Sequence, residues 1–342
     1  MNRLYTLDYL RGIAAFSIML YHYLIWTTGK FGPDTIMSRL GIYGVSIFYI
    51  LSGLTLYYVY YNKMKPTQPE IVAFVKKRIF RIFPLLWLVT ISAILLSRKS
   101  PNFYDLFLNL SGLFGFVKWE IYFSAGVWSI GNELVFYFFF PFFILFAKSF
   151  RPYFILLSAV LFSLYLYFAF TKLNPQKTLG EQWIDYVNPL NQVFLFLGGF
   201  LIGLFFSKIK LRNSLIVALF FIGLSLFAFM PTHGETINLV TGYNRLIFTF
   251  SCLLICFCFY KLTIKFPSYI HKPLTLLGEV SYSIYLLHPI IYDVIGRLRN
   301  YTLDFSDTTR LILSMCITLI AAYFTYEYFE KFFMKFAKQR KE

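Results

Sequence analysis

The chain has 342 residues, of which 58% are apolar and only 14% are charged, and its mean hydropathy is +0.63. A soluble domain carries about 25% charged residues, so this composition excludes an ordinary soluble globular fold. The formal net charge of +16 would suggest nucleic-acid binding in a soluble protein, but its distribution here indicates membrane topology, and no nucleic-acid partner is expected.

Apolar runs of about 20 residues, the length that crosses the hydrocarbon core of a bilayer, recur along the chain. They predict an all-α, polytopic membrane protein with about ten transmembrane helices. The predicted spans are 8–28, 41–61, 79–97, 127–147, 152–171, 190–207, 212–230, 242–261, 274–296 and 310–330. The stretch 103–117 is shorter and contains Asp105 and Asn109, so we expect an interfacial or re-entrant helix there.

Lysine and arginine collect in cytoplasmic loops, and the loops that share a side with the N-terminus hold roughly twice as many as the opposite loops. The predicted orientation is therefore N-in/C-in, in an inner or plasma membrane. No small-residue cleavage site follows the first span, so we expect it to remain as an anchor. We predict one membrane domain over 1–335 and a basic cytoplasmic tail over 336–342.

All four cysteines lie within predicted spans, at Cys252, Cys256, Cys258 and Cys316. The C-x-x-x-C-x-C spacing of the first three lacks the usual zinc pattern, so we interpret them as small apolar filler and predict no metal site.

The first span carries two residues that a membrane disfavours, because a charged side chain at a helix centre costs about 2.5–3.5 kcal/mol on insertion scales. Arg11 and His22 are eleven residues apart, which places them on one helical stripe about 16 Å apart along the axis. Asp8 precedes Arg11 by three residues and can pair with it. A snorkelling Arg11 and a structurally buried His22 are the alternatives to functional roles.

The third span begins with VKKRIFRIFPLLW, in which Arg78 and Arg81 share one helical face. We interpret Lys76 and Lys77 as topology charges. Arg81 lies a turn deeper, and a guanidinium pair suits phosphate oxygens. Arg11, Arg78 and Arg81 share a cytoplasmic depth and can form a clamp for a phosphorylated ligand.

The fourth span places Ser129, Glu133 and Tyr137 on one stripe. Glu133 and His22 both lie about 9 Å from the outer end of their spans, which predicts a histidine–carboxylate pair if the spans are neighbours. A purely structural hydrogen bond of Glu133 is the alternative.

The ninth span places Ser281, Tyr285 and His288 on one face, as a hydrogen-bonding seam or as pore-lining residues. Small residues in the second span predict close helix packing, and these are Gly41, Gly44, Ser52 and Gly53.

Five stretches in this order resemble the acyltransferase 3 family of membrane acyltransferases. They are LDYLRGIAAFSIMLYH, GVSIFYILSG, RIFRIFPLLW, WSIGNELVFYFFFP and SYSIYLLHP. The resemblance covers the whole chain and includes the ten-helix layout. It implies transfer of an acyl group, usually acetyl, from cytoplasmic acyl-CoA to a hydroxyl, usually on a glycan or lipid-linked sugar.

Residue by residue, the resemblance places the essential histidine on His22, its motif arginine on Arg11 and the paired arginines on Arg78 and Arg81. The acid of the Trp-Ser-x-x-x-Glu motif falls on Glu133. His22 and Glu133 are thus the expected catalytic residues, and the three arginines are expected to bind acyl-CoA.

The family's last span often ends in Glu-basic-Pro, whereas Phe332 follows Glu330 and Lys331 here. We therefore assign Glu330 no chemical role.

These assignments lead to a mechanistic hypothesis. Arg11 holds the phosphate end of CoA, and the stripe from Arg11 to His22 is the path of the pantetheine arm. His22 is the general base for the acceptor hydroxyl, and Glu133 fixes its tautomer. An acyl-histidine intermediate is the alternative to direct transfer.

Two other function classes remain open. A transporter or glycan flippase would use the polar stripe as a translocation path, although we find none of the internal repeats that many transporters show. An O-acyltransferase of the unrelated histidine–asparagine type would use His288 as its catalytic residue. His22→Ala and His288→Ala variants distinguish the two enzyme classes.

Overall fold

The computed structural model describes residues 3–65, 67–264, 266–301 and 305–337, and within these ranges every regular element is helical. In chain order the elements are α1 (Tyr5–Thr28), α2 (Ile36–Tyr60), α3 (Gln68–Ser97), α4 (Phe103–Ser111), α5 (Phe114–Val117), α6 (Val127–Ser149), α7 (Arg151–Tyr167), η1 (Phe168–Lys172), α8 (Trp183–Tyr186), α9 (Pro189–Phe206), α10 (Asn213–Phe229), η2 (Thr236–Leu239), α11 (Gly242–Lys261), α12 (Ser268–Glu279), α13 (Ser281–Tyr301), α14 (Asp307–Phe324), η3 (Thr325–Glu330) and α15 (Lys331–Phe336).

The prediction of an all-α polytopic membrane protein is confirmed. By length and composition, seven helical segments of the described chain can cross a membrane, or eight if the bent pair α12–α13 is one span. The two other predicted spans coincide with α1, which carries Asp8 and Arg11, and with α10, which is apolar but only 17 residues long. The N-in/C-in orientation remains a prediction.

The predicted interfacial helix at 103–117 is two short helices, α4 and α5. They are separated at Gly112, whose φ of 76° is the left-handed conformation that ends a helix. The predicted single domain remains a prediction, and most of the predicted tail, residues 338–342, lies outside the described residues.

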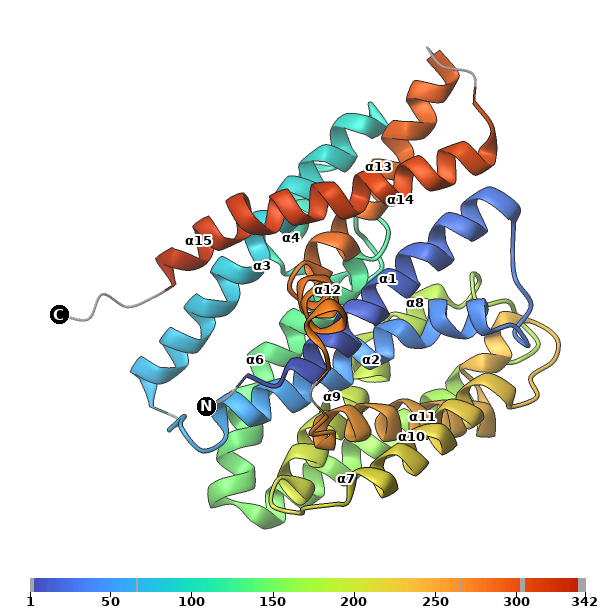
Figure 1. Cartoon of the computed structure of the whole chain (residues 1–342). Coiled ribbons are helices and arrows are strands. Elements are labelled where there is room, and N and C mark those ends of the chain that lie inside the picture. Colours follow the sequence, from blue (N-terminus) through green and yellow to red (C-terminus); the bar gives the residue numbers. More distant parts are fainter. Residues whose placement is uncertain (1–2, 66, 265, 302–304, 338–342) are drawn as a thin grey trace.

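Helix α2 lies at the centre of the bundle and packs closely against α9 (Figure 1). A Cβ atom on Gly53 would stand 1.9 Å from the carbonyl oxygen of Phe196, and one on Gly199 would stand 1.9 Å from that of Ile50. Only glycine permits this approach of the two backbones. The predicted packing role of Gly53 is therefore confirmed, and α2 is held rigidly against α9.

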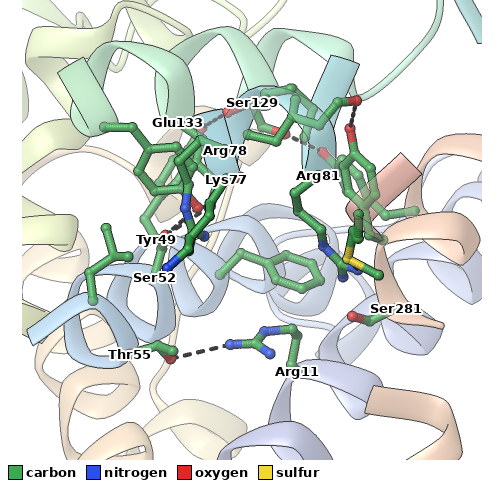
Figure 2. Close-up of a pocket in the computed structure, with 18 of the residues that line it drawn as sticks. Arg11, Tyr49, Ser52, Thr55, Lys77, Arg78, Arg81, Ser129, Glu133 and Ser281 are labelled. Atoms are coloured by element: carbon green, nitrogen blue, oxygen red, sulfur yellow. Dashed lines mark hydrogen bonds between the residues drawn. The ribbon is translucent and has the colours of Figure 1, made fainter. Parts of the chain in front are cut away.

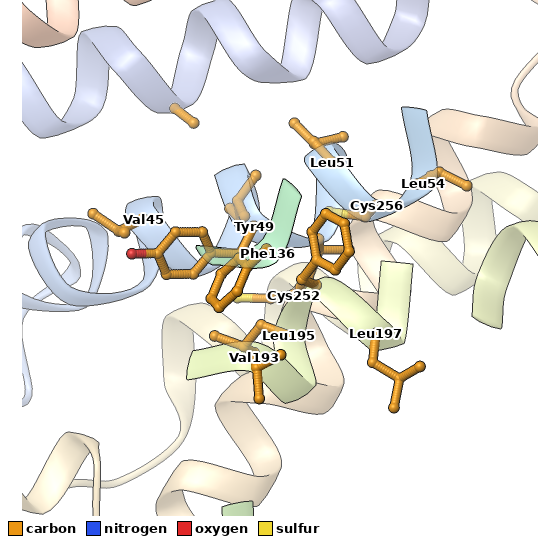
Figure 3. Close-up of a cluster of buried hydrophobic side chains, with 14 of the residues drawn as sticks. Val45, Tyr49, Leu51, Leu54, Phe136, Val193, Leu195, Leu197, Cys252 and Cys256 are labelled. Carbon is orange, nitrogen blue, oxygen red and sulfur yellow. The ribbon is translucent and has the colours of Figure 1, made fainter. Parts of the chain in front are cut away.

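The interior beside this contact is apolar and includes two cysteines. Cys252 and Cys256 of α11 are fully buried and lie among Leu51 and Leu54 of α2 and neighbouring side chains of α9 (Figure 3). Their interpretation as small apolar filler is confirmed by this packing.

The C-terminal helices form one long rod. Residues Asp307–Phe336 run through α14, the π-helical segment η3 and α15 (Figure 1). This rod contacts α13 along α14, and α3 along α15. Helix α13 begins after a 65° bend from α12. The cavity lies where the first half of α3, the start of α13 and the end of α15 approach α1 and α2.

Candidate functional site

A cavity of about 490 Å³ lies between α1, α2, α3, α6, α13 and α15. Its lining residues are Arg11, Phe48, Tyr49, Ser52, Thr55, Leu56, Lys77, Arg78, Arg81, Ile82, Ser129, Ile130, Glu133, Tyr137, Ser281, Tyr282, Tyr285, Met334 and Ala337. Figure 2 shows cationic side chains entering it from different helices, Arg11 from α1 and the others from α3. We call it the cationic cavity, because it holds four cationic side chains and one carboxylate.

Arg11 and Arg78 reach the cavity from the two helices that the sequence singled out. Arg11 forms the predicted ion pair with Asp8, with 3.2 Å between Nη1 and Oδ1, and its Nη2 donates to Thr55 Oγ1 at 3.2 Å. The Arg78 guanidinium lies over aromatic rings, 5.4 Å from the centroid of Tyr137. Its buried Nε has no hydrogen-bond partner among the described residues. A buried donor of this kind is costly unless it is satisfied.

Arg81 forms an ion pair that the sequence analysis missed. Its Nη1 lies 3.0 Å from Oε2 of Glu330, whose side chain is only 1% exposed, while Arg81 remains 28% exposed. Ser283 of α13 donates to the other carboxylate oxygen of Glu330. Glu330 therefore fixes one face of Arg81, and the exposed remainder of the guanidinium is free to meet a ligand. The sequence did contain a signal for Glu330, because it is an acidic residue within the last apolar run.

Lys77 was interpreted as a topology charge, yet it lines the cavity. It precedes Arg81 by four residues, so both side chains lie on one face of α3. The four-residue spacing could have indicated that Lys77 belongs to the same site as Arg81.

Glu133 lines the cavity together with Ser129 and Tyr137, as expected for a single stripe of α6. Glu133 Oε1 accepts from Ser52 Oγ at 2.8 Å and from the Tyr137 hydroxyl. Glu133 lines the same cavity as the four cationic side chains, so this carboxylate balances part of their charge.

The predicted pair of His22 with Glu133 is wrong. Among the described residues, His22 bonds instead with His288, with 2.9 Å between its Nδ1 and the Nε2 of His288. Similar depth in the membrane remains a prediction, and depth alone does not determine which neighbour a helix faces. α1 packs against α13, and this contact brings the histidines together. We call His22 and His288 the histidine pair.

The three residues of the predicted α13 seam do not all belong to the same site. Ser281 and Tyr285 line the cavity, whereas His288 does not. The Tyr285 hydroxyl bonds with Ser129 Oγ at 2.8 Å, and the ring centroids of Tyr285 and His288 are 6.1 Å apart. Phe48 packs edge-on against Tyr285. Phe48 and Tyr285 thus form an aromatic wall between the cavity and the histidine pair.

The predicted path along α1 from Arg11 to His22 is not open. Ala15 and Ile18, which lie between them on that side of the helix, are fully buried. Ile18 fills the space beside Gly44 of α2. The open space leads instead from Arg11 between α2, α6 and α13 to the aromatic wall.

A family comparison extends these observations. The model of the acyltransferase 3 family, described as an acyltransferase domain, matches residues 4–327. No significant match was found among curated proteins or among solved structures.

Proposed function

The chain belongs to the acyltransferase 3 family, and on this premise we propose that it transfers an acetyl group from cytoplasmic acetyl-CoA to a hydroxyl of a cell-envelope carbohydrate. The family match supports acyl transfer in general. The donor, the acceptor and the roles of individual residues are our proposals, as is the location in an inner or plasma membrane.

The cationic cavity is the observation that supports an acyl-CoA donor. Arg11, Lys77, Arg78 and Arg81 face a volume of about 490 Å³ that contains one carboxylate, Glu133. Arginine forks bind phosphate oxygens with paired, charge-assisted hydrogen bonds. The phosphates of CoA match these donors, and the pantetheine arm would extend from them toward the aromatic wall.

The position of the cavity supports access from the cytoplasm. Arg11 lies in the second turn of α1, and Arg78 and Arg81 lie in the first half of α3. Both helix starts are on the side that the lysine and arginine distribution predicts to be cytoplasmic. Acyl-CoA would enter there, with its thioester end directed toward the aromatic wall.

His22 is the proposed general base. Its imidazole accepts the proton of the acceptor hydroxyl while the hydroxyl oxygen attacks the thioester carbonyl carbon. The carbon–sulfur bond then breaks, and the thiolate takes the proton from His22, which gives the O-acyl product and free CoA. Glu133 retains a proposed catalytic part, now as the carboxylate that anchors Ser52 and Tyr137 and faces the arginines. The aromatic wall must move for the thioester to reach His22.

The decisive test uses purified protein in liposomes with labelled acetyl-CoA and added envelope glycans. We expect the wild type to release CoA and to label a glycan, and His22→Ala to do neither. His233→Ala is the matched control, because His233 is exposed on a loop far from α1 in the sequence. Wild-type protein that is folded but neither binds nor consumes acetyl-CoA would refute the proposal and would favour the transporter alternative.

A further inference from the structure

The histidine pair carries an inference that the family match does not supply. His288 is fully buried, and both of its ring nitrogens make polar contacts. Its Nδ1 lies 3.1 Å from the backbone oxygen of Ile284, and its Nε2 lies 2.9 Å from Nδ1 of His22. These two contacts together determine where the protons are.

A carbonyl oxygen only accepts hydrogen bonds, so Nδ1 of His288 must carry a proton. The carbonyl of Tyr285 also interacts with the His288 ring. Pro289 follows His288 in α13 and has no N–H, which leaves that carbonyl without its usual helical donor. The proline after His288 therefore leaves the Tyr285 carbonyl available to the His288 ring.

His288 is neutral in this setting. Its ring neighbours are Tyr23, Trp26, Tyr285 and His22, and no carboxylate pairs with it among the described residues. A second proton would create a buried cation without a counter-charge, which is costly. In a neutral imidazole with Nδ1 protonated, Nε2 has a lone pair and accepts.

His22 must then donate its Nδ1 proton to His288, because an acceptor facing an acceptor would repel. The two ring planes are within 12° of parallel, so the in-plane N–H and lone pair can point at each other. Trp26 lies within 8° of parallel to His22, with 5.0 Å between the ring centroids, and restricts the tilt of that ring. A neutral His22 with its proton on Nδ1 has its lone pair on Nε2.

We infer that His288 is the positioning residue for His22, which it holds in the tautomer whose Nε2 accepts a proton. This inference rests on the proposed role of His22 as the base. His288 thereby takes the place that was predicted for Glu133. When Nε2 of His22 gains the acceptor proton, the Nδ1 proton can shift toward His288 and spread the charge over both rings, and the Ile284 and Tyr285 carbonyls remain acceptors for His288.

The first test observes the tautomer directly by ¹⁵N NMR of histidine-labelled protein in lipid nanodiscs. The chain has only four histidines, and His22→Gln assigns the signal of His22. We expect His22 to be the Nδ1–H tautomer in the wild type, and to lose this preference in His288→Leu. A wild-type His22 with its proton on Nε2 would overturn the inference, whether or not the protein transfers acyl groups.

The second test uses two substitutions that differ in which nitrogen they imitate. The amide oxygen of His288→Gln can take the place of Nε2 and still accept from His22, whereas His288→Asn can keep only the contact on the Nδ1 side. We expect kcat to fall about 100-fold in His288→Asn and to recover largely in His288→Gln, with KM for acetyl-CoA unchanged in both.

The outcomes separate the two proposals. If wild-type protein shows the expected tautomer but no turnover of acetyl-CoA, the proposed function fails and the placement of the proton stands. If His288→Gln is as inactive as His288→Asn while both remain folded by thermal denaturation, His288 itself handles the proton and the positioning role is refuted.

Discussion

The cationic cavity and the histidine pair lie on either side of one aromatic wall and differ in width, charge and exposure. The cavity is wide and charged, and two of its arginines, Arg11 and Arg81, keep exposed faces beside their own carboxylate partners. The histidine pair is narrow and aromatic, and its two imidazoles are hydrogen-bonded to each other. Exposed charge suits a ligand that must enter and leave, whereas a packed, neutral ring pair suits a proton transfer that needs fixed geometry. Binding and chemistry should therefore be separable by mutation.

The largest effect is expected at the histidine pair. His22→Ala removes the proposed base, and general-base catalysis contributes about 10²- to 10⁴-fold, so kcat should fall by that factor. The KM for acetyl-CoA should stay within twofold of the wild-type value, because the cavity is intact. Steady-state release of CoA measures both parameters. A raised KM with unchanged kcat would contradict the division between the two regions.

The next effect is expected in the cavity. Arg78→Ala and Arg81→Ala should each raise KM for acetyl-CoA about 10- to 100-fold, since a hydrogen bond to a charged group contributes about 1.5–3 kcal/mol. S-acetylpantetheine, a donor without phosphates, should be used equally by wild type and variants. Arg151→Ala is the matched control, because Arg151 is exposed at the start of α7. Equal losses with both donors would contradict phosphate binding.

A smaller effect is expected for Glu330→Gln. The amide can still accept from Ser283 but no longer attracts Arg81, so Arg81 loses its fixed position. Because Arg81 is partly exposed, we expect KM for acetyl-CoA to rise only about threefold. Competition by free CoA against acetyl-CoA measures the change. Loss of kcat with an unchanged KM would instead assign Glu330 to the chemical step.

The smallest effect is expected for Thr55→Ala. It removes one neutral acceptor from Arg11 at 3.2 Å and leaves the ion pair with Asp8 in place. An ordinary hydrogen bond contributes about 0.5–1.5 kcal/mol, and the length of this one favours the low end, so KM should rise about twofold. Isothermal titration with CoA resolves a change of this size. An effect as large as that of Arg81→Ala would show that Thr55 contacts the ligand itself.

The sequence predicted features that depend on neighbours within one helix. The pair of Asp8 with Arg11 and the stripe through Glu133 follow from helical spacing alone, and both are present. The apolar runs likewise predicted the helices of the bundle, because bilayer thickness limits their length.

Features that depend on contacts between helices were harder to predict. His22 and His288 are 266 positions apart, and depth in the membrane left several partners equally possible for each. Glu330 gained its role from the approach of the C-terminal rod to α3. Lys77 required knowledge of which face of α3 lines the cavity. In each case the deciding information was helix rotation and neighbour order, which one sequence does not contain.

Helix α13 connects the cationic cavity to the histidine pair. It starts after the bend from α12, and Ser281 and Tyr285 in its first turns line the cavity. His288 lies one turn further along the same helix. A ligand that displaces the Tyr285 side chain therefore acts on the same helix that positions the imidazole of His288. The proposed donor site and the proposed base are therefore coupled through one helix, and an inhibitor bound against Tyr285 should reduce acyl transfer without contacting either histidine.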